Sequence, residues 1–147
     1  MNMADKPVYT TASVNTGARN GESHTPDRSY EVNVDTPKEM GGSGNGTNPE
    51  QLFALGYSAC YHAALDHYKK EEKIKNKSQV TLTVHLLKDP SDGGFKLSVE
   101  IEVGIEDLSD SKVEDLANKA HHYCPYSKAT MGNIDVKVSA VPYVEGK

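Results

Sequence analysis

The 147-residue sequence predicts an α+β fold with a mostly antiparallel sheet. Strand-like segments lie near both ends of the chain and are joined by hairpin-type connections, whereas the helical segments lie between them. The long apolar segment Asn48–Tyr68 is the helix around which the other elements are expected to pack. Since no repeat or low-complexity tract interrupts the chain, we expect one domain spanning residues 1–147.

The N-terminal third contains two segments that alternate polar and apolar residues, Val8–Asn15 and Tyr30–Val34, and both are predicted strands. The polar segment Thr16–Ser29 between them is longer than a tight hairpin needs, and long loops between strands often carry functional residues. It contains Arg19 within the sequence GARNG. The glycine-rich segment Met40–Gly46 lacks the Lys-Ser/Thr of a phosphate-binding loop, so it is expected only to lead into the central helix.

The central helix begins with residues that favour a helix start. Asn48 or Thr47 can cap it, Pro49 suits its first turn, and Thr47 with Glu50 forms a capping-box pattern. Apolar residues then recur at spacings of three and four, which predicts a buried face. This face comprises Leu52, Phe53, Leu55, Ala59, Cys60, Ala63 and Ala64.

The C-terminal half predicts a hairpin, a helix and a last strand. Val80–Leu87 and Phe95–Val103 alternate as antiparallel strands do, after the charged segment Lys69–Ser78 has carried the chain out of the core. Ser109–His122 reads as a helix capped by Ser109 or Asp110, and Ile134–Val141 as the strand that completes the sheet. The apolar stripe of this second helix is Val113, Leu116, Ala117 and Ala120.

Composition excludes several functions. The net charge of −5 argues against a nucleic-acid or anionic-membrane partner, and no apolar run approaches the length of a membrane span. The N-terminal residues lack the apolar region of a secretion signal, so a cytoplasmic location is expected. Two cysteines in such a protein do not form a disulfide framework, and they suggest redox or metal chemistry, or a chance occurrence.

The two cysteines differ in their predicted surroundings. A cysteine inside an apolar helix, such as Cys60, is most often an inert small hydrophobic residue. Cys124 precedes Pro125, which is favoured at a first helical position, so Cys124 is expected at a helix N-cap, where peptide N–H groups favour the thiolate. Two such thiols with an arginine and a glutamate nearby are typical of a thiol peroxidase, in which one thiolate attacks the O–O bond and the second resolves the sulfenic acid.

Three motifs extend this interpretation: GARNG, NPEQLFALGYSACY and HYCPYSKATMGNIDV. In this order they resemble the organic hydroperoxide resistance (Ohr) proteins of the OsmC-like superfamily, and the resemblance runs from about Tyr9 to Val141. It implies mostly antiparallel sheets around central helices in an intertwined homodimer. It also implies an enzyme that reduces alkyl and lipid hydroperoxides without a bound cofactor or metal and is recycled by lipoyl groups on proteins.

The resemblance also implies roles for individual residues. Cys60 matches the peroxidatic cysteine, Cys124 the resolving cysteine, Arg19 the arginine that contacts the thiolate, and Glu50 the glutamate that orients this arginine. The residues expected around the substrate are Leu52, Phe53, Tyr57 and Tyr61. The family commonly has phenylalanine at the position of Tyr61, so this chain is expected to add a hydroxyl beside the reactive thiol.

Local chemistry requires a cation near the attacking thiol. Burial alone raises the pKa of a cysteine, so a buried Cys60 needs a permanent positive charge, for which Arg19 held by Glu50 is the candidate. Ten positions on one straight helix separate Glu50 from Cys60 by roughly 15 Å. Either the first turn of this helix bends back, or the site is shared across the dimer, and we favour a shared site in which Arg19 and Glu50 act on the Cys60 of the other subunit.

Two alternatives remain open at this point. Cys60, His62, His121 and Cys124 could supply a Cys/His zinc site, although residues two apart on a helix point in divergent directions. The chain could also be a non-enzymatic redox or stress-response binding protein. A zinc assay tests the first alternative, and a peroxide-consumption assay tests the second.

Overall fold

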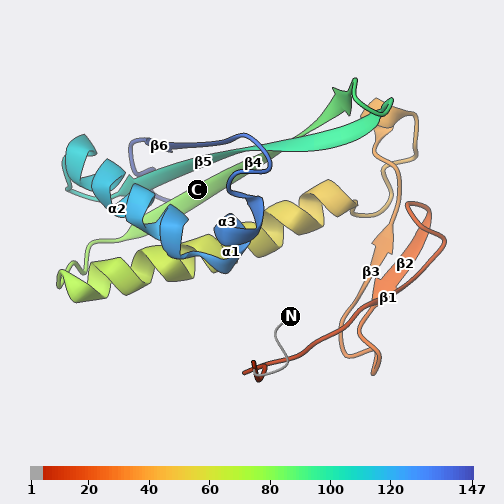
Figure 1. The fold of residues 1–147 in the computed structure, drawn as a ribbon, viewed down its shortest axis with the longest axis horizontal. Coiled ribbons are helices and arrows are strands. Elements are labelled where there is room, and N and C mark those ends of the chain that lie inside the picture. Colours follow the sequence, from red (N-terminus) through yellow and green to blue (C-terminus); the bar gives the residue numbers. More distant parts are fainter. Residues whose placement is uncertain (1–4) are drawn as a thin grey trace. The chain divides into compact units, whose positions relative to one another are not determined.

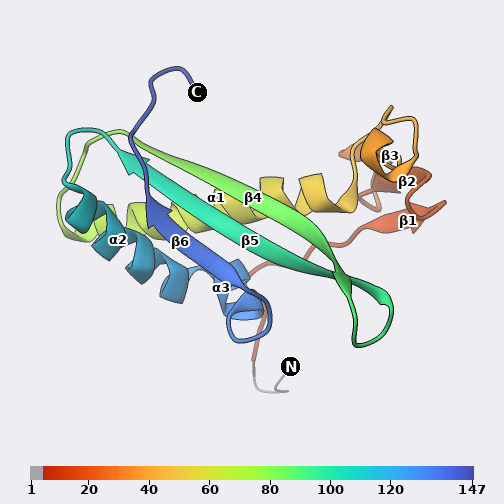
Figure 2. The ribbon, with the colours of Figure 1, turned by 90° about the horizontal axis from the view of Figure 1, so that it is seen from above.

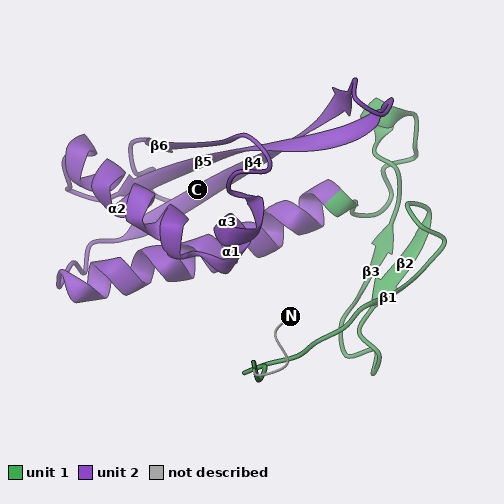
Figure 3. Ribbon diagram, viewed as in Figure 1, with its two compact units in different colours: residues 1–49 green, residues 50–147 purple. Residues whose placement is uncertain are grey.

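The computed structural model describes residues 5–147 and divides the chain into two compact units, the first ending at Pro49 and the second spanning Glu50–Lys147 (Figures 1 and 3). In the first unit, β1 (Val14–Thr16), β2 (Gly21–His24) and β3 (Glu31–Val34) form an antiparallel sheet in this order. A short 3-10 helix, η1 (Lys38–Met40), follows.

The predicted long connection between the first two strands is wrong, because β2 forms inside it. A tight turn joins β1 to β2, and in it the backbone N–H of Asn20 donates to the carbonyl of Gly17 at 2.9 Å. The Asn15 side chain accepts from the Ala18 N–H at 3.0 Å, and Ala18 adopts the left-handed φ of 53°. The sequence of β2, GESH, has no apolar alternation, so its strand character was not visible in the sequence.

The second unit is built on α1 (Pro49–Glu71), a single continuous helix that confirms the predicted central helix (Figure 1). The elements that follow are β4 (Ser78–Asp89), β5 (Gly94–Ile105), α2 (Asp110–Tyr123), α3 (Pro125–Thr130) and β6 (Val136–Ala140). The Ser109 hydroxyl caps α2 by accepting from the Lys112 N–H at 3.3 Å. In the described residues, no helix has both the length and the apolar character to cross a membrane.

A second three-stranded sheet has the order β4-β5-β6, with an antiparallel hairpin and a parallel last strand. The parallel pairing of β5 and β6 is possible because α2 and α3 form the crossover between them. In the hairpin, Val84, Leu82 and Val80 pair with Val99, Ile101 and Val103, so these six residues share one face. Figure 2, seen from above, shows that α1 passes behind this sheet and that α2 lies alongside β6.

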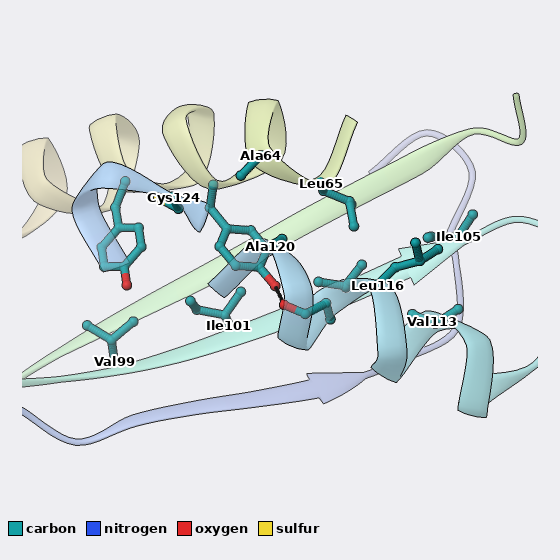
Figure 4. Close-up of a cluster of buried hydrophobic side chains, with 13 residues drawn as sticks. Ala64, Leu65, Val99, Ile101, Ile105, Val113, Leu116, Ala120 and Cys124 are labelled. Atoms are coloured by element: carbon teal, nitrogen blue, oxygen red, sulfur yellow. Dashed lines mark hydrogen bonds between the residues drawn. The ribbon is translucent and has the colours of Figure 1, made fainter. Parts of the chain in front are cut away.

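The core of the second unit lies between the helices and the sheet (Figure 4). Its thirteen buried residues are Tyr57, Tyr61, Ala64, Leu65, Val99, Ile101, Val103, Ile105, Val113, Leu116, Ala117, Ala120 and Cys124. All four residues of the predicted α2 stripe are among them. The predicted buried face of α1 is only partly correct, since Leu55 is 66% exposed and Ala59 and Ala63 are also exposed. The rings of Tyr57 and Tyr61 fill the space beneath α1, whereas Ala59 and Ala63 lie on its outer side.

Candidate functional site

Both cysteines are free thiols at the junction of the three helices. Cys60 is half-buried in the middle of α1, whereas Cys124 has no exposed surface. Cys124 ends α2 and is the N-cap of α3, with Pro125 in the first helical position, as the sequence predicted. Its backbone N–H donates to the carbonyl of Ala120 at 2.9 Å, so the turn from α2 to α3 fixes its backbone.

The thiol of Cys60 interacts with two groups from this turn, the thiol of Cys124 and the backbone N–H of Tyr126. Burial raises the pKa of the Cys60 thiol, the Tyr126 N–H opposes this rise, and the neighbouring Cys124 adds to it. The predicted effect of burial on Cys60 is therefore confirmed. The structure also brings together two cysteines that are 64 positions apart in the sequence.

Helix α3 packs closely on the turn of α1 that precedes Cys60. A Cβ added at Gly56 would lie 2.8 Å from the Tyr126 hydroxyl oxygen, so the glycine makes room for this ring. The centroid of the Tyr126 ring lies 5.4 Å from that of Tyr57 and 6.1 Å from that of Phe53. Sequence reasoning missed Tyr126, although its position two residues after Cys124 in the motif HYCPYS was a usable signal.

The four residues expected around a substrate fall into two pairs. Leu52 and Phe53 are half-buried in the first turns of α1. Tyr57 and Tyr61 have no exposed surface, and their hydroxyls are bonded within the core. The Tyr61 hydroxyl donates to the carbonyl of Ala117 in α2 at 2.6 Å, and burial raises the pKa of this phenol. The hydroxyl that Tyr61 adds is thus engaged within the core, and the role of Tyr61 toward a substrate stays a prediction.

Arg19 and Glu50 lie in different units. Arg19 is half-buried in the turn between β1 and β2, and Glu50 is in the first turn of α1. Glu50 and Cys60 share one continuous helix, so the premise of the separation of roughly 15 Å along its axis is confirmed. The roles of Arg19 and Glu50 toward the thiol stay predictions.

The histidines of the zinc alternative are engaged elsewhere. His62 Nε2 lies 2.7 Å from the Ser78 hydroxyl, and His121 Nδ1 lies 2.8 Å from the Ser127 hydroxyl. Burial lowers the pKa of both imidazoles. Among residues 5–147, no three His, Cys, Asp or Glu side chains converge as a metal site would require. The zinc alternative therefore has no ligand set in this part of the chain.

Comparison with protein families and known sequences gives a consistent result. Residues 42–139 match the family described as OsmC-like protein. The organic hydroperoxide resistance protein-like 2 of Staphylococcus epidermidis is 48% identical over 133 residues, which cover 89% of this chain and 94% of that protein.

Solved structures agree with this match. A crystal structure of an organic hydroperoxide resistance protein from Legionella pneumophila has a TM-score of 0.86 and 43% identity, and covers 92% of this chain and 98% of its own. The crystal structure of the organic hydroperoxide resistance protein OhrB of Bacillus subtilis has a TM-score of 0.84 and 42% identity, with 92% and 100% covered.

Proposed function

Because this chain belongs to the OsmC-like family and, within it, to the organic hydroperoxide resistance proteins, we propose that it is a thiol-dependent peroxidase that reduces organic hydroperoxides to alcohols. The observation that carries this proposal is the pairing of a half-buried thiol on α1 with a buried thiol at the start of α3. An isolated core cysteine would be inert, whereas a neighbouring second thiol provides a route to a reversible disulfide.

The proposed cycle has three balanced steps. The Cys60 thiolate attacks the terminal oxygen of the hydroperoxide, the O–O bond breaks, and the products are Cys60 sulfenic acid and an alkoxide that is protonated to the alcohol. The Cys124 thiol then attacks the Cys60 sulfur, and the sulfenic oxygen leaves as water. An external dithiol reduces the resulting disulfide through a mixed disulfide and itself becomes a cyclic disulfide. A lipoyl group on a protein is the proposed dithiol, and no bound cofactor is needed.

Activation of Cys60 is assigned to Arg19 and Glu50. Since burial raises the pKa of Cys60, a neighbouring guanidinium is needed to favour the thiolate at neutral pH. A carboxylate can hold such a guanidinium through a bidentate pair. The separation of Glu50 and Cys60 along α1 supports a site in which these groups come from two subunits.

A homodimer would complete such a site. The exposed residues Leu55, Ala59 and Ala63 form an apolar stripe on α1, and the small size of the two alanines suits close helix packing about a two-fold axis. Co-expression of differently tagged Cys60→Ser and Glu50→Ala chains tests this arrangement. In a shared site the isolated mixed dimer regains about one working site, whereas in a site built from one chain it is no better than its parents.

The proposed substrates carry apolar groups. Leu52 and Phe53 are the half-buried residues that support this, because burying each methylene of an alkyl tail contributes about 0.8 kcal/mol. Cumyl or fatty-acid hydroperoxides are therefore expected to exceed hydrogen peroxide in kcat/KM. The cytoplasmic location predicted from the N-terminal sequence stays a prediction.

The mass of the protein after one equivalent of an alkyl hydroperoxide tests the central proposal. Loss of two hydrogens, with Cys60 and Cys124 in one linked peptide after digestion, is the expected result. An unchanged mass together with unconsumed hydroperoxide would instead favour the non-enzymatic binding protein.

A further inference from the structure

A buried chain of hydroxyl groups joins the three helices that surround the thiols. The Ser127 hydroxyl lies 2.8 Å from the Tyr57 hydroxyl and 2.8 Å from His121 Nδ1. The Thr130 hydroxyl lies 3.0 Å from the Tyr57 hydroxyl. Tyr57 and Ser127 have no exposed surface, and Thr130 is 7% exposed. The chain thus links α1, the end of α2 and α3, and its hydroxyl groups are buried while His121 at its α2 end is half-buried.

This chain runs alongside the pair of thiols. Tyr57 and Cys60 are three positions apart on α1, and residues with this spacing share a face of a helix. Ser127 likewise follows Cys124 by three positions across the first turn of α3. The Tyr57–Ser127 hydrogen bond and the Cys60–Cys124 interaction are therefore two neighbouring contacts between the same faces of α1 and α3.

Helix α3 depends on these contacts for its position. It has only six residues, and helices of this length are not stable on their own. Its N-cap residue, Cys124, makes no side-chain capping bond. Tyr126 rests on α1 over Gly56, but it is 38% exposed and its ring contacts are apolar and non-directional. The buried hydroxyl bridge of Ser127 is a directional contact, so it restricts how α3 can rotate about its axis.

We propose that Ser127, bridged between Tyr57 and His121, is a positioning residue that keeps the Cys124 thiol in register with Cys60 for disulfide formation. The attack of Cys124 on a Cys60 sulfenic acid rests on the proposed function. The alignment of the two thiols does not, because it also controls disulfide formation with other thiol reagents. An intramolecular attack depends on how well the two sulfurs are aligned, so loosening α3 slows disulfide formation more than it slows the first reaction of Cys60.

The test uses Ser127→Ala and Tyr57→Phe, with Ser78→Ala as the matched control. The Ser78 hydroxyl also bridges a histidine and a second group, at 2.7 Å from His62 Nε2 and 2.9 Å from Lys69 Nζ, but both of these partners belong to α1 and neither to α3. A merely structural role of the removed hydroxyl would lower the Tm of all three variants and leave the relative rates of the two thiol reactions unchanged.

The first measurement uses 2,2′-dithiodipyridine and needs no peroxide. Cys60 attacks this disulfide and releases one thiopyridone, and Cys124 then displaces the second as the intramolecular disulfide forms. We expect the second release, which is independent of reagent concentration, to slow about tenfold in Ser127→Ala and Tyr57→Phe, the equivalent of about 1.4 kcal/mol. In Ser78→Ala it should be unchanged. Equal second-release rates in Ser127→Ala and Ser78→Ala would overturn the proposal.

The second measurement repeats the comparison with an alkyl hydroperoxide and a sulfenic-acid trap such as dimedone. Ser127→Ala should give more trapped Cys60 and more over-oxidised Cys60 than Ser78→Ala, because resolution competes with both reactions. If hydroperoxide fails to react with any variant while the thiopyridone rates differ as expected, the peroxidase proposal fails and the positioning role stands. If the hydroperoxide reacts but the trapped fraction is equal in both variants, the positioning role fails alone.

Discussion

The two units of the chain are stabilised in different ways. Among the described residues of the first unit, Val34 at 5% exposure is the single buried apolar side chain. Its strands are joined by exposed polar contacts such as the ion pairs of Arg28 with Glu22 at 3.0 Å and with Glu31 at 3.1 Å, and exposed ion pairs add little stability. The second unit instead buries thirteen residues between two helices and a sheet.

This difference separates the two parts of the proposed chemistry. Both thiols belong to the unit with the packed core, so their mutual geometry is expected to persist under conditions in which weaker regions open. Arg19 lies in a tight turn of the unit with little buried apolar area. Regions of this kind open locally at low free-energy cost. We therefore expect substitution of either thiol to abolish repeated turnover and substitution of Arg19 to reduce the rate in a graded way.

The largest effect is expected from the cysteines. Cys60→Ser should abolish reaction with an alkyl hydroperoxide, because the attacking thiolate is lost. Cys124→Ser should consume about one equivalent and then stall as a sulfenic acid or over-oxidise. Stoichiometric peroxide consumption and intact-protein mass measure both outcomes. A single turnover by Cys60→Ser with an inert Cys124→Ser would reverse the two roles.

A smaller, graded effect is expected from Arg19→Ala. An opposite charge beside a thiolate lowers its pKa by about 1–3 units, so removing Arg19 should raise the Cys60 pKa and reduce the thiolate at neutral pH by about tenfold or more. The rate of Cys60 alkylation rises with pH as the thiolate forms, and its midpoint should move upward in Arg19→Ala. Arg19→Lys, which keeps the charge but not the fork, should show a smaller shift. Identical midpoints in wild type and Arg19→Ala would remove Arg19 from the mechanism.

The contrast in core packing can be measured directly. Leu116 has no exposed surface, so Leu116→Ala should reduce the free energy of unfolding by about 2–5 kcal/mol. Val32 in β3 is 37% exposed, and Val32→Ala should change the free energy of unfolding by less than about 0.5 kcal/mol. Urea unfolding followed by circular dichroism compares the two variants. Similar losses would mean that the first unit is held as firmly as the second.

Patterns within single elements could be predicted from the sequence. The central helix, the hairpin of β4 and β5, the apolar stripe of α2 and the N-cap position of Cys124 all follow from local spacing and capping residues, and all are confirmed. β2 could not be predicted, because its residues are polar and its pairing with β1 and β3 depends on turns at both ends.

The detailed contacts of the site were harder to predict, because they join distant parts of the chain. The spacing pattern of α1 placed Leu55 in the core, but the tyrosines at positions 57 and 61 are buried in its place. Each tyrosine finds a hydrogen-bond partner more than fifty positions away, and a periodicity argument does not contain that information. The role proposed for Ser127 rests on the same kind of contact.

The smallest expected effect concerns the turn between β2 and β3, which depends on one exposed carboxylate. Asp27 Oδ1 accepts from the Ser29 N–H at 3.0 Å, the Ser29 hydroxyl at 2.7 Å and the Thr25 hydroxyl at 2.8 Å. The Ser29 N–H is the main cause that lowers the pKa of Asp27 to about 2, and the two hydroxyls add to it. Because this pKa lies below the value of about 3.9 in an unfolded chain, the contribution of Asp27 is present above that pH.

Acidification through pH 2 should therefore loosen this turn before it affects the thiol pair. In an NMR titration, the Ser29 amide is expected to shift with a midpoint near 2, as the Asp27 carboxylate that holds it is protonated. Asp27→Ala should remove this titration and leave the kcat/KM for an alkyl hydroperoxide unchanged, because this turn lies at the end of β2 opposite to the turn that holds Arg19. A Ser29 midpoint near 3.9 would show that these hydrogen bonds do not form in solution. The first unit would then lack one of the polar contacts by which it is distinguished from the second unit.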